Sequence, residues 1–111
     1  MTIESTTQGN ARVVKLSGRM TEEMALQLEQ ASQDLQGAGL DHLVLDIAEL
    51  QYVSSLGLRS FVRVAKSFHG TGKAALLCGM KGVVKEVFEM AHMGGLFKTF
   101  DSVDAALASL G

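Results

Sequence analysis

Two adjacent serines, in the stretch Val53-Ser54-Ser55-Leu56-Gly57, mark the part of this sequence best suited to chemistry. The apolar run before them, from His42 to Ile47, includes one carboxylate, that of Asp46. After the serines, apolar residues recur with the period of a helix rather than that of a strand. A strand, a turn with two hydroxyls and a helix N-terminus together suit the holding or recognition of an anion, because free backbone N–H groups face the turn.

The serines have two interpretations. Ser54 or Ser55 can cap the helix, which is the commonest role of serine at such a position, and on these residues alone we prefer capping. Alternatively, one hydroxyl is a phosphorylation target. A phosphoserine would carry about −1.5 to −2 charges beside the positive end of the helix dipole and would change the surface that a partner meets.

Asp46 also has two interpretations. It is expected near the C-terminal end of a central strand, where open α/β sheets place ligands. We prefer the structural interpretation, in which the carboxylate accepts hydrogen bonds from nearby backbone N–H groups and fixes the following loop. An enzyme that used Asp46 and Ser55 would need a general base, and none stands at a readable spacing.

The remaining candidates for chemistry are isolated in the sequence. His42, His69 and His92 lie far apart, and the single cysteine, Cys78, has no Cys or His at ligand spacing. There is no Gly-x-Ser-x-Gly nucleophile elbow. We therefore predict a non-enzymatic protein with no metal site and no cofactor.

The helix after the serines carries a surface that suits a protein partner. At about 100° per residue, one side of it is apolar and should face the core, with Leu58, Phe61, Val62 and Ala65. Arg59, Arg63 and Lys66 form a basic stripe beside that side, and Leu56, Ser60 and Ser67 should project away from the core. A lone exposed leucine is ordinary, but an apolar anchor flanked by Arg59, Ser60 and Arg63 also suits an interface.

The elements around this turn predict an α/β domain. Strands are expected near residues 3–7, 11–17, 43–47, 73–79 and 97–100. Helices are expected from a Thr21 cap to Gly37, from the serines to Phe68, from Lys81 to Ala91, and after a cap at Asp101 or Ser102. Gly18-Arg19-Met20 is expected to turn the chain. The resulting order, β-β-α-β-α-β-α-β-α, implies a mostly parallel sheet.

Composition limits the function classes. The 111 residues, 47% apolar and 20% charged, predict a single globular domain over residues 1–111. The net charge of −2 offers no basic footprint for nucleic acid. No apolar run is long enough to insert into a membrane, and the N-terminus lacks the features of a signal peptide. We expect a cytoplasmic protein, either a monomer or a weak dimer.

Several stretches, in the same order along the chain, resemble the STAS domain family, the fold of bacterial anti-sigma factor antagonists. These are Val14 to Met20, Leu43 to Asp46, Tyr52 to Arg59, and the segments between Val83 and Leu107. The resemblance covers nearly the whole chain. It implies a STAS-like (SpoIIAA-like) α/β fold, with a mixed four- to five-stranded sheet and about four helices, mainly on one side.

The resemblance further implies a regulatory module that binds another protein. In the antagonist branch the partner is an anti-sigma factor that is also a serine kinase, and phosphorylation at the start of the second helix breaks the complex. The implied partner surface here comprises Ser54, Ser55, Leu56, Arg59, Ser60 and Arg63. The alternative is the cytoplasmic STAS component of a transporter, such as a lipid-transport ABC complex with its ATPase subunit, or of a stress-signalling assembly.

This sequence departs from the family pattern at two positions. The usual phosphoacceptor is the Ser or Thr immediately before the glycine, and here Leu56 stands in that place. Ser55 is then the candidate acceptor, with Ser54 as the second choice. Thr21 replaces the usual Asp of the family's Gly-x-Leu-Asp turn.

Overall fold

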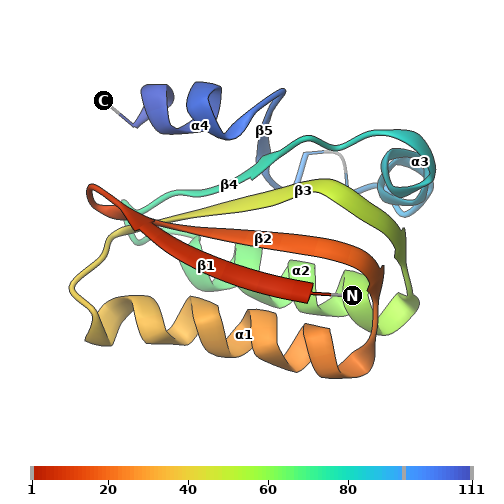
Figure 1. Cartoon of the computed structure of the whole chain (residues 1–111), viewed down its shortest axis with the longest axis horizontal. Helices are drawn as coiled ribbons and strands as arrows, with labels where there is room; N and C mark the ends of the chain where they lie inside the picture. The colour runs from red at the N-terminus through yellow and green to blue at the C-terminus, as the bar shows by residue number, and fades with distance from the viewer. Residues whose placement is uncertain (1, 94, 111) are drawn as a thin grey trace.

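Five strands form one sheet whose spatial order follows the chain, β1-β2-β3-β4-β5 (Figure 1). The computed structural model describes residues 2–93 and 95–110. β1 (Thr2–Gln8) pairs antiparallel with β2 (Ala11–Met20), whereas β3 (His42–Val53), β4 (Ala75–Cys78) and β5 (Lys98–Phe100) extend the sheet in parallel. The predicted mixed sheet and the predicted order of elements are confirmed.

The four helices divide unequally between the two faces of the sheet (Figure 1). α1 (Glu22–Gly37), α2 (Ser55–Phe68) and α3 (Gly82–Met90) contribute Leu28, Phe61 and Phe88 to the larger core. α4 (Val103–Ser109) covers the opposite face and contributes Ala106 to a smaller core. The resemblance therefore predicted correctly that the helices lie mainly on one side.

Alternation along the strands separates these two cores. Leu43 and Leu45 of β3 point into the larger core, and Val44 between them points into the smaller one. All three side chains are 0% exposed. β3 is thus a strand covered on both faces, as its continuous apolar run predicts.

β3 is longer than predicted, because a bulge interrupts its alternation. Lys15 of β2 pairs with Asp46, but Ser17 pairs with Glu49, so β3 holds one extra residue in this interval. The apolar period breaks there, and the sequence therefore predicted an end at Ile47. Pairing with β4 stops at Asp46, opposite Cys78, and the rest of β3 pairs with β2 alone.

β2 also continues past its predicted end. The prediction that Gly18-Arg19-Met20 turns the chain is wrong, because β2 runs to Met20. A second irregularity in the pairing lies between Gly18 and Arg19, and Gly18 has a φ of +85°. Glycine adopts this conformation without strain, so the residue that predicts a turn instead accommodates a bulge.

Within the residues that the structure describes, no helix is both long enough and apolar enough to cross a membrane.

Candidate partner-binding surface at the serine turn

Ser54 caps the start of α2. Its Oγ accepts a hydrogen bond from the backbone N–H of Gly57 at 3.2 Å, and it donates one to the carbonyl oxygen of Met20 at 3.4 Å. Its own carbonyl oxygen accepts from the N–H of Leu58 at 2.9 Å. Of the two serines, Ser54 therefore takes the capping role, and its hydroxyl also joins the ends of β2 and β3.

Ser55 is the first residue of α2 and is exposed. Within the described part of the chain, no hydrogen bond engages its hydroxyl. The two serine hydroxyls therefore differ chemically. The hydroxyl of Ser54 is hydrogen-bonded within the fold, and the hydroxyl of Ser55 is accessible to an enzyme.

Gly57 allows the first turn of α2 to approach the sheet closely. A Cβ at this position would lie 2.6 Å from Cγ of Met20 and 3.0 Å from Cγ1 of Val53. Real Cβ atoms do not tolerate the shorter distance, so any side chain here would displace Met20 or the helix. The glycine thus fixes where Ser55 and Leu56 stand relative to the strand ends.

Leu56 stands out from the surface in this first turn, with 46% of its area exposed. Arg59 and Arg63 are exposed along the same helix, and Nη1 of Arg63 lies 3.2 Å from Oε1 of Glu29 in α1. The expected exposure of Leu56 agrees with the structure. Its role as a partner contact stays a prediction.

Ser60 does not belong to this exposed set. It is 1% exposed, and its Oγ donates a hydrogen bond to the carbonyl oxygen of Ala25 at 2.9 Å. The prediction that it projects away from the core is wrong, because α1 packs against that side of α2. Ser60 connects the two helices and does not reach the surface.

Asp46 acts inside β3 rather than after it. Its Oδ1 accepts a hydrogen bond from the backbone N–H of Ala48 at 3.1 Å. The carboxylate therefore holds the bulge that separates Asp46 from Glu49. The expected bonding to a nearby backbone N–H is present, but it does not fix the loop that follows the strand.

Leu26 is a surface residue that the sequence reasoning missed. It lies in α1, is 62% exposed, and lines a groove of about 200 Å³ together with Leu56. Glu22, Glu29, Arg59 and Arg63 line the same groove. Leu26 follows the buried Met24 by two positions, which places it off the apolar stripe of its helix. This position off the apolar stripe is the sequence signal that could have identified Leu26 as an exposed residue.

Cys78 and Asp46 are neighbours in the sheet, and the thiol is deeply buried. Cys78 is 1% exposed and its Sγ donates to the carbonyl oxygen of Leu45 at 3.5 Å. Burial, and secondarily the charge of Asp46, raise the pKa of the thiol to about 12. Because the thiolate is the reactive form, this cysteine is inert near neutral pH.

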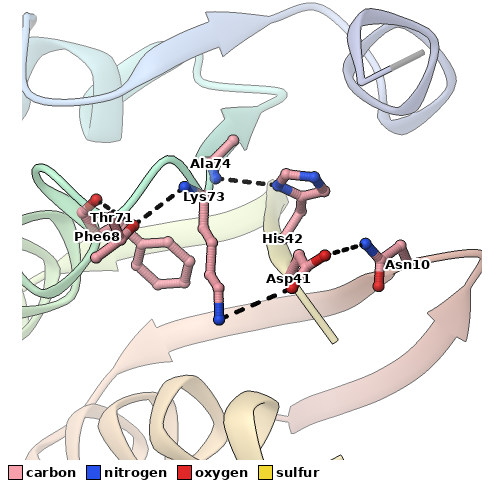
Figure 2. Close-up of polar contacts among 7 residues, drawn as sticks. All are labelled: Asn10, Asp41, His42, Phe68, Thr71, Lys73 and Ala74. Carbon is pink, nitrogen blue, oxygen red and sulfur yellow. Dashed lines mark hydrogen bonds and ion pairs between the residues drawn. The ribbon is translucent and has the colours of Figure 1, made fainter. Parts of the chain in front are cut away.

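A cluster of polar contacts closes the opposite end of the sheet, where β3 begins (Figure 2). We call Asn10, Asp41, His42 and Lys73 the polar cluster. Asp41 accepts a hydrogen bond from Nδ2 of Asn10 and lies 3.8 Å from Nζ of Lys73. Nδ1 of His42 accepts from the backbone N–H of Ala74 at 3.0 Å, so this histidine has a structural role.

Comparison with known proteins places this geometry in a family. Residues 2–106 match the STAS domain. BtrV of Bordetella bronchiseptica, whose name assigns it to the anti-sigma factor antagonists, is 35% identical over 94 residues, which cover 85% of this chain and 81% of BtrV.

Solved structures show the same fold at lower identity. An anti-sigma factor antagonist from Mycobacterium paratuberculosis has a TM-score of 0.83 at 19% identity, over 97% of this chain and 92% of that one. A sulfate transporter family protein from Wolinella succinogenes has a TM-score of 0.79 at 16% identity, over 94% and 87%. The chain thus belongs to the STAS domain family, and within it to the anti-sigma factor antagonist-like proteins.

Proposed function

We propose that this protein is a non-enzymatic anti-sigma factor antagonist, which sequesters an anti-sigma factor/serine kinase. Its contact surface consists of Ser54, Ser55, Leu56, Arg59 and Arg63. The observation that carries the proposal is Leu56, a large apolar side chain left 46% exposed in a helical turn whose position is fixed by a cap and a close glycine contact. The similarity to BtrV supports the same conclusion.

The chemistry of this surface supports a protein partner. A preorganised apolar anchor binds at low entropic cost, because its backbone is already ordered before the partner arrives. Exposed arginines beside it supply hydrogen bonds and charge, and arginine is enriched in protein interfaces. Ser60 is left out of this exposed set, because it is 1% exposed and its hydroxyl bonds to the carbonyl oxygen of Ala25.

Phosphorylation of this surface, if the partner is a kinase, would fall on Ser55. Leu56 cannot accept a phosphate, and modification of Ser54 would remove the cap to Gly57. A phosphate on Ser55 would place negative charge next to Leu56 without breaking a described hydrogen bond. Phosphopeptide mapping of the protein from cells should find Ser55 modified, and a complete absence of phosphate under all growth conditions would contradict this part of the proposal.

The experiment that tests the function compares the wild-type protein with Leu56→Asp. Pull-down from a lysate of the source organism, followed by mass spectrometry, should recover a serine kinase of the anti-sigma type. Titration calorimetry with that purified kinase should show at least about tenfold weaker binding for Leu56→Asp, as expected for an apolar anchor. Met90→Asp is the control, because Met90 is also a highly exposed apolar residue, at 80%, but lies on α3 and is not among the residues of the proposed contact surface.

Two results would contradict the proposal. Unchanged affinity of Leu56→Asp, with native circular dichroism, would exclude the surface. Recovery of an ATPase and a permease instead of a kinase would favour a role as the STAS component of a transporter. That role needs no phosphoacceptor at the position of Leu56.

A further inference from the structure

The proposed contact surface lies on α2, but the groove beside it is lined by residues of both α1 and α2. Leu26 of α1 and Leu56 of α2 line it and are both exposed, at 62% and 46%. Ala25 and Ser60 also line it, and both are buried. Small buried residues between two exposed leucines make a floor that another chain can approach closely.

The size of the groove indicates a side chain rather than a metabolite. Its volume of about 200 Å³ lies below the roughly 300–1,000 Å³ that is typical of small-molecule sites. A space of this size suits one or two apolar side chains from a partner. The two walls extend over Glu22–Glu29 and Leu56–Arg63, eight residues each, which corresponds to about 12 Å or two helical turns.

The arrangement of the walls favours a helix as the occupant. α1 and α2 both begin where a parallel strand ends, and they lie side by side on the same face of the sheet (Figure 1). A third helix can place residues at i and i+3 or i+4 into the groove between two such helices. The ion pair between Glu29 and Arg63, at 3.2 Å, bridges the groove farther along the helices.

Charge gives the occupant an orientation. Glu29 and Arg63 are paired with one another. Within the described residues, neither Glu22 nor Arg59 has an ion pair, and both are exposed. The α1 wall thus presents a free carboxylate, and the α2 wall presents a free guanidinium.

From these observations we infer that the groove receives a two-turn amphipathic helix of the partner. Its apolar residues lie between Leu26 and Leu56, an acidic residue faces Arg59, and a basic residue faces Glu22. The inference rests on the proposed function, and it adds α1 to a contact surface that otherwise lies on α2.

The test uses the full-length protein and the anti-sigma factor/serine kinases encoded in the source genome, purified one by one. Calorimetry compares the wild type with Leu26→Asp, Leu56→Asp and the control Met90→Asp. Leu26→Asp and Leu56→Asp should each weaken binding by at least about tenfold, and Met90→Asp should bind like the wild type. Circular dichroism and thermal melting verify that the three variants remain folded.

The charges are tested separately with Arg59→Glu and Glu22→Lys. Each should weaken binding severalfold, and their effects should grow at low salt. Hydrogen exchange on the complex should show protection of the first two turns of both α1 and α2, and of one helix in the kinase.

The outcomes separate this inference from the function. If Leu56→Asp loses affinity while Leu26→Asp binds like the wild type, the groove is excluded and the proposed function stands. Protection of a strand instead of a helix in the kinase would likewise overturn the groove. If no kinase binds the wild-type protein, both the groove and the proposed function are overturned.

Discussion

At the end of the sheet where β3 leads into α2, Ser54 and Gly57 make close contacts with Met20, and Leu56 stands exposed beside them. At the other end, where β3 begins, Asp41 joins Asn10 and Lys73 through solvent-accessible polar groups (Figure 2). The first end is ordered by packing and by a helix cap, and the second by exposed polar contacts. Because the first end is already ordered, it can hold the apolar Leu56 exposed for binding. The contacts at the second end serve only to connect the elements of the fold.

The largest effect should come from the core beneath the serine turn. Phe61 is 0% exposed and packs edge-on against Phe88 and Phe97, with ring centroids 5.3 and 6.2 Å away. Phe61→Ala should lower the free energy of unfolding by about 3–5 kcal/mol, measured by urea denaturation. Phe68→Ala, at the other end of α2 and only half-buried, is the matched control. An equal loss for both would contradict the contrast between the ends.

A smaller effect should follow from removal of the cap. Ser54→Ala should cost about 1 kcal/mol of unfolding free energy, because the N–H of Gly57 loses its acceptor. Ser55→Ala should change the free energy by less than about 0.5 kcal/mol, as expected for an exposed side chain. If the two alanine variants were equally stable, the assignment of the cap to Ser54 would be incorrect.

The polar cluster should give a still smaller effect that depends on salt. Lys73 and Asp41 are 40% and 48% exposed in their side chains, and exposed ion pairs contribute only about 0–1 kcal/mol. Lys73→Ala should therefore cost less than Ser54→Ala, and the cost should shrink further in about 1 M salt. The cost of Ser54→Ala should not change with salt. Denaturation of both variants at two salt concentrations distinguishes these behaviours.

Cys78 should have no influence on the pH dependence near neutrality. Its pKa is raised from 9.0 to about 12 in the folded protein, so the unfolded chain loses the thiol proton first. The protonated thiol's contribution to stability is complete below pH 9 and is lost as the pH rises towards 12. The wild type should therefore lose stability more steeply than Cys78→Ala in this interval only. If the free energy of unfolding of the two proteins instead changed in parallel between pH 9 and 12, the pKa of the thiol would not be raised by burial.

The starts of α1, α2 and α4 were predictable because a capping side chain marks each of them, whereas no side chain caps α3. Oγ1 of Thr21 accepts from the N–H of Met24 at 3.2 Å, and Oγ of Ser102 accepts from the N–H of Ala105 at 3.1 Å. Thr21 was the expected cap of α1, and Ser102 was one of two expected caps of α4, the other being Asp101. The order of elements followed from the same local patterns, because the switch between apolar periods is visible within a few residues.

Strand ends and burial were less predictable because they depend on neighbours distant in sequence. The end expected at Ile47 and the turn expected at Gly18 both reflect bulges, whose pairing partners lie in another strand. Ser60 was expected at the surface because a helical wheel does not show that α1 covers that side of α2.

The candidate site was only half visible in the sequence for the same reason. Leu56 could be identified from its own helix, and its exposure agrees with the structure. Leu26 lies on a different helix, and only the packing of α1 against α2 brings it to the same groove. A pattern within one helix cannot reveal a surface that two helices share.

The parallel pairing of β2 with β3 also has a consequence for how fast the protein folds. β1 and β2 meet through a tight turn, but β2 can meet β3 only after the chain has passed through α1. Pairing between strands so far apart in sequence is slow, because the loop between them must be ordered first. Formation of α1 shortens that loop. The helix that lines the groove therefore also influences the rate at which β2 and β3 pair.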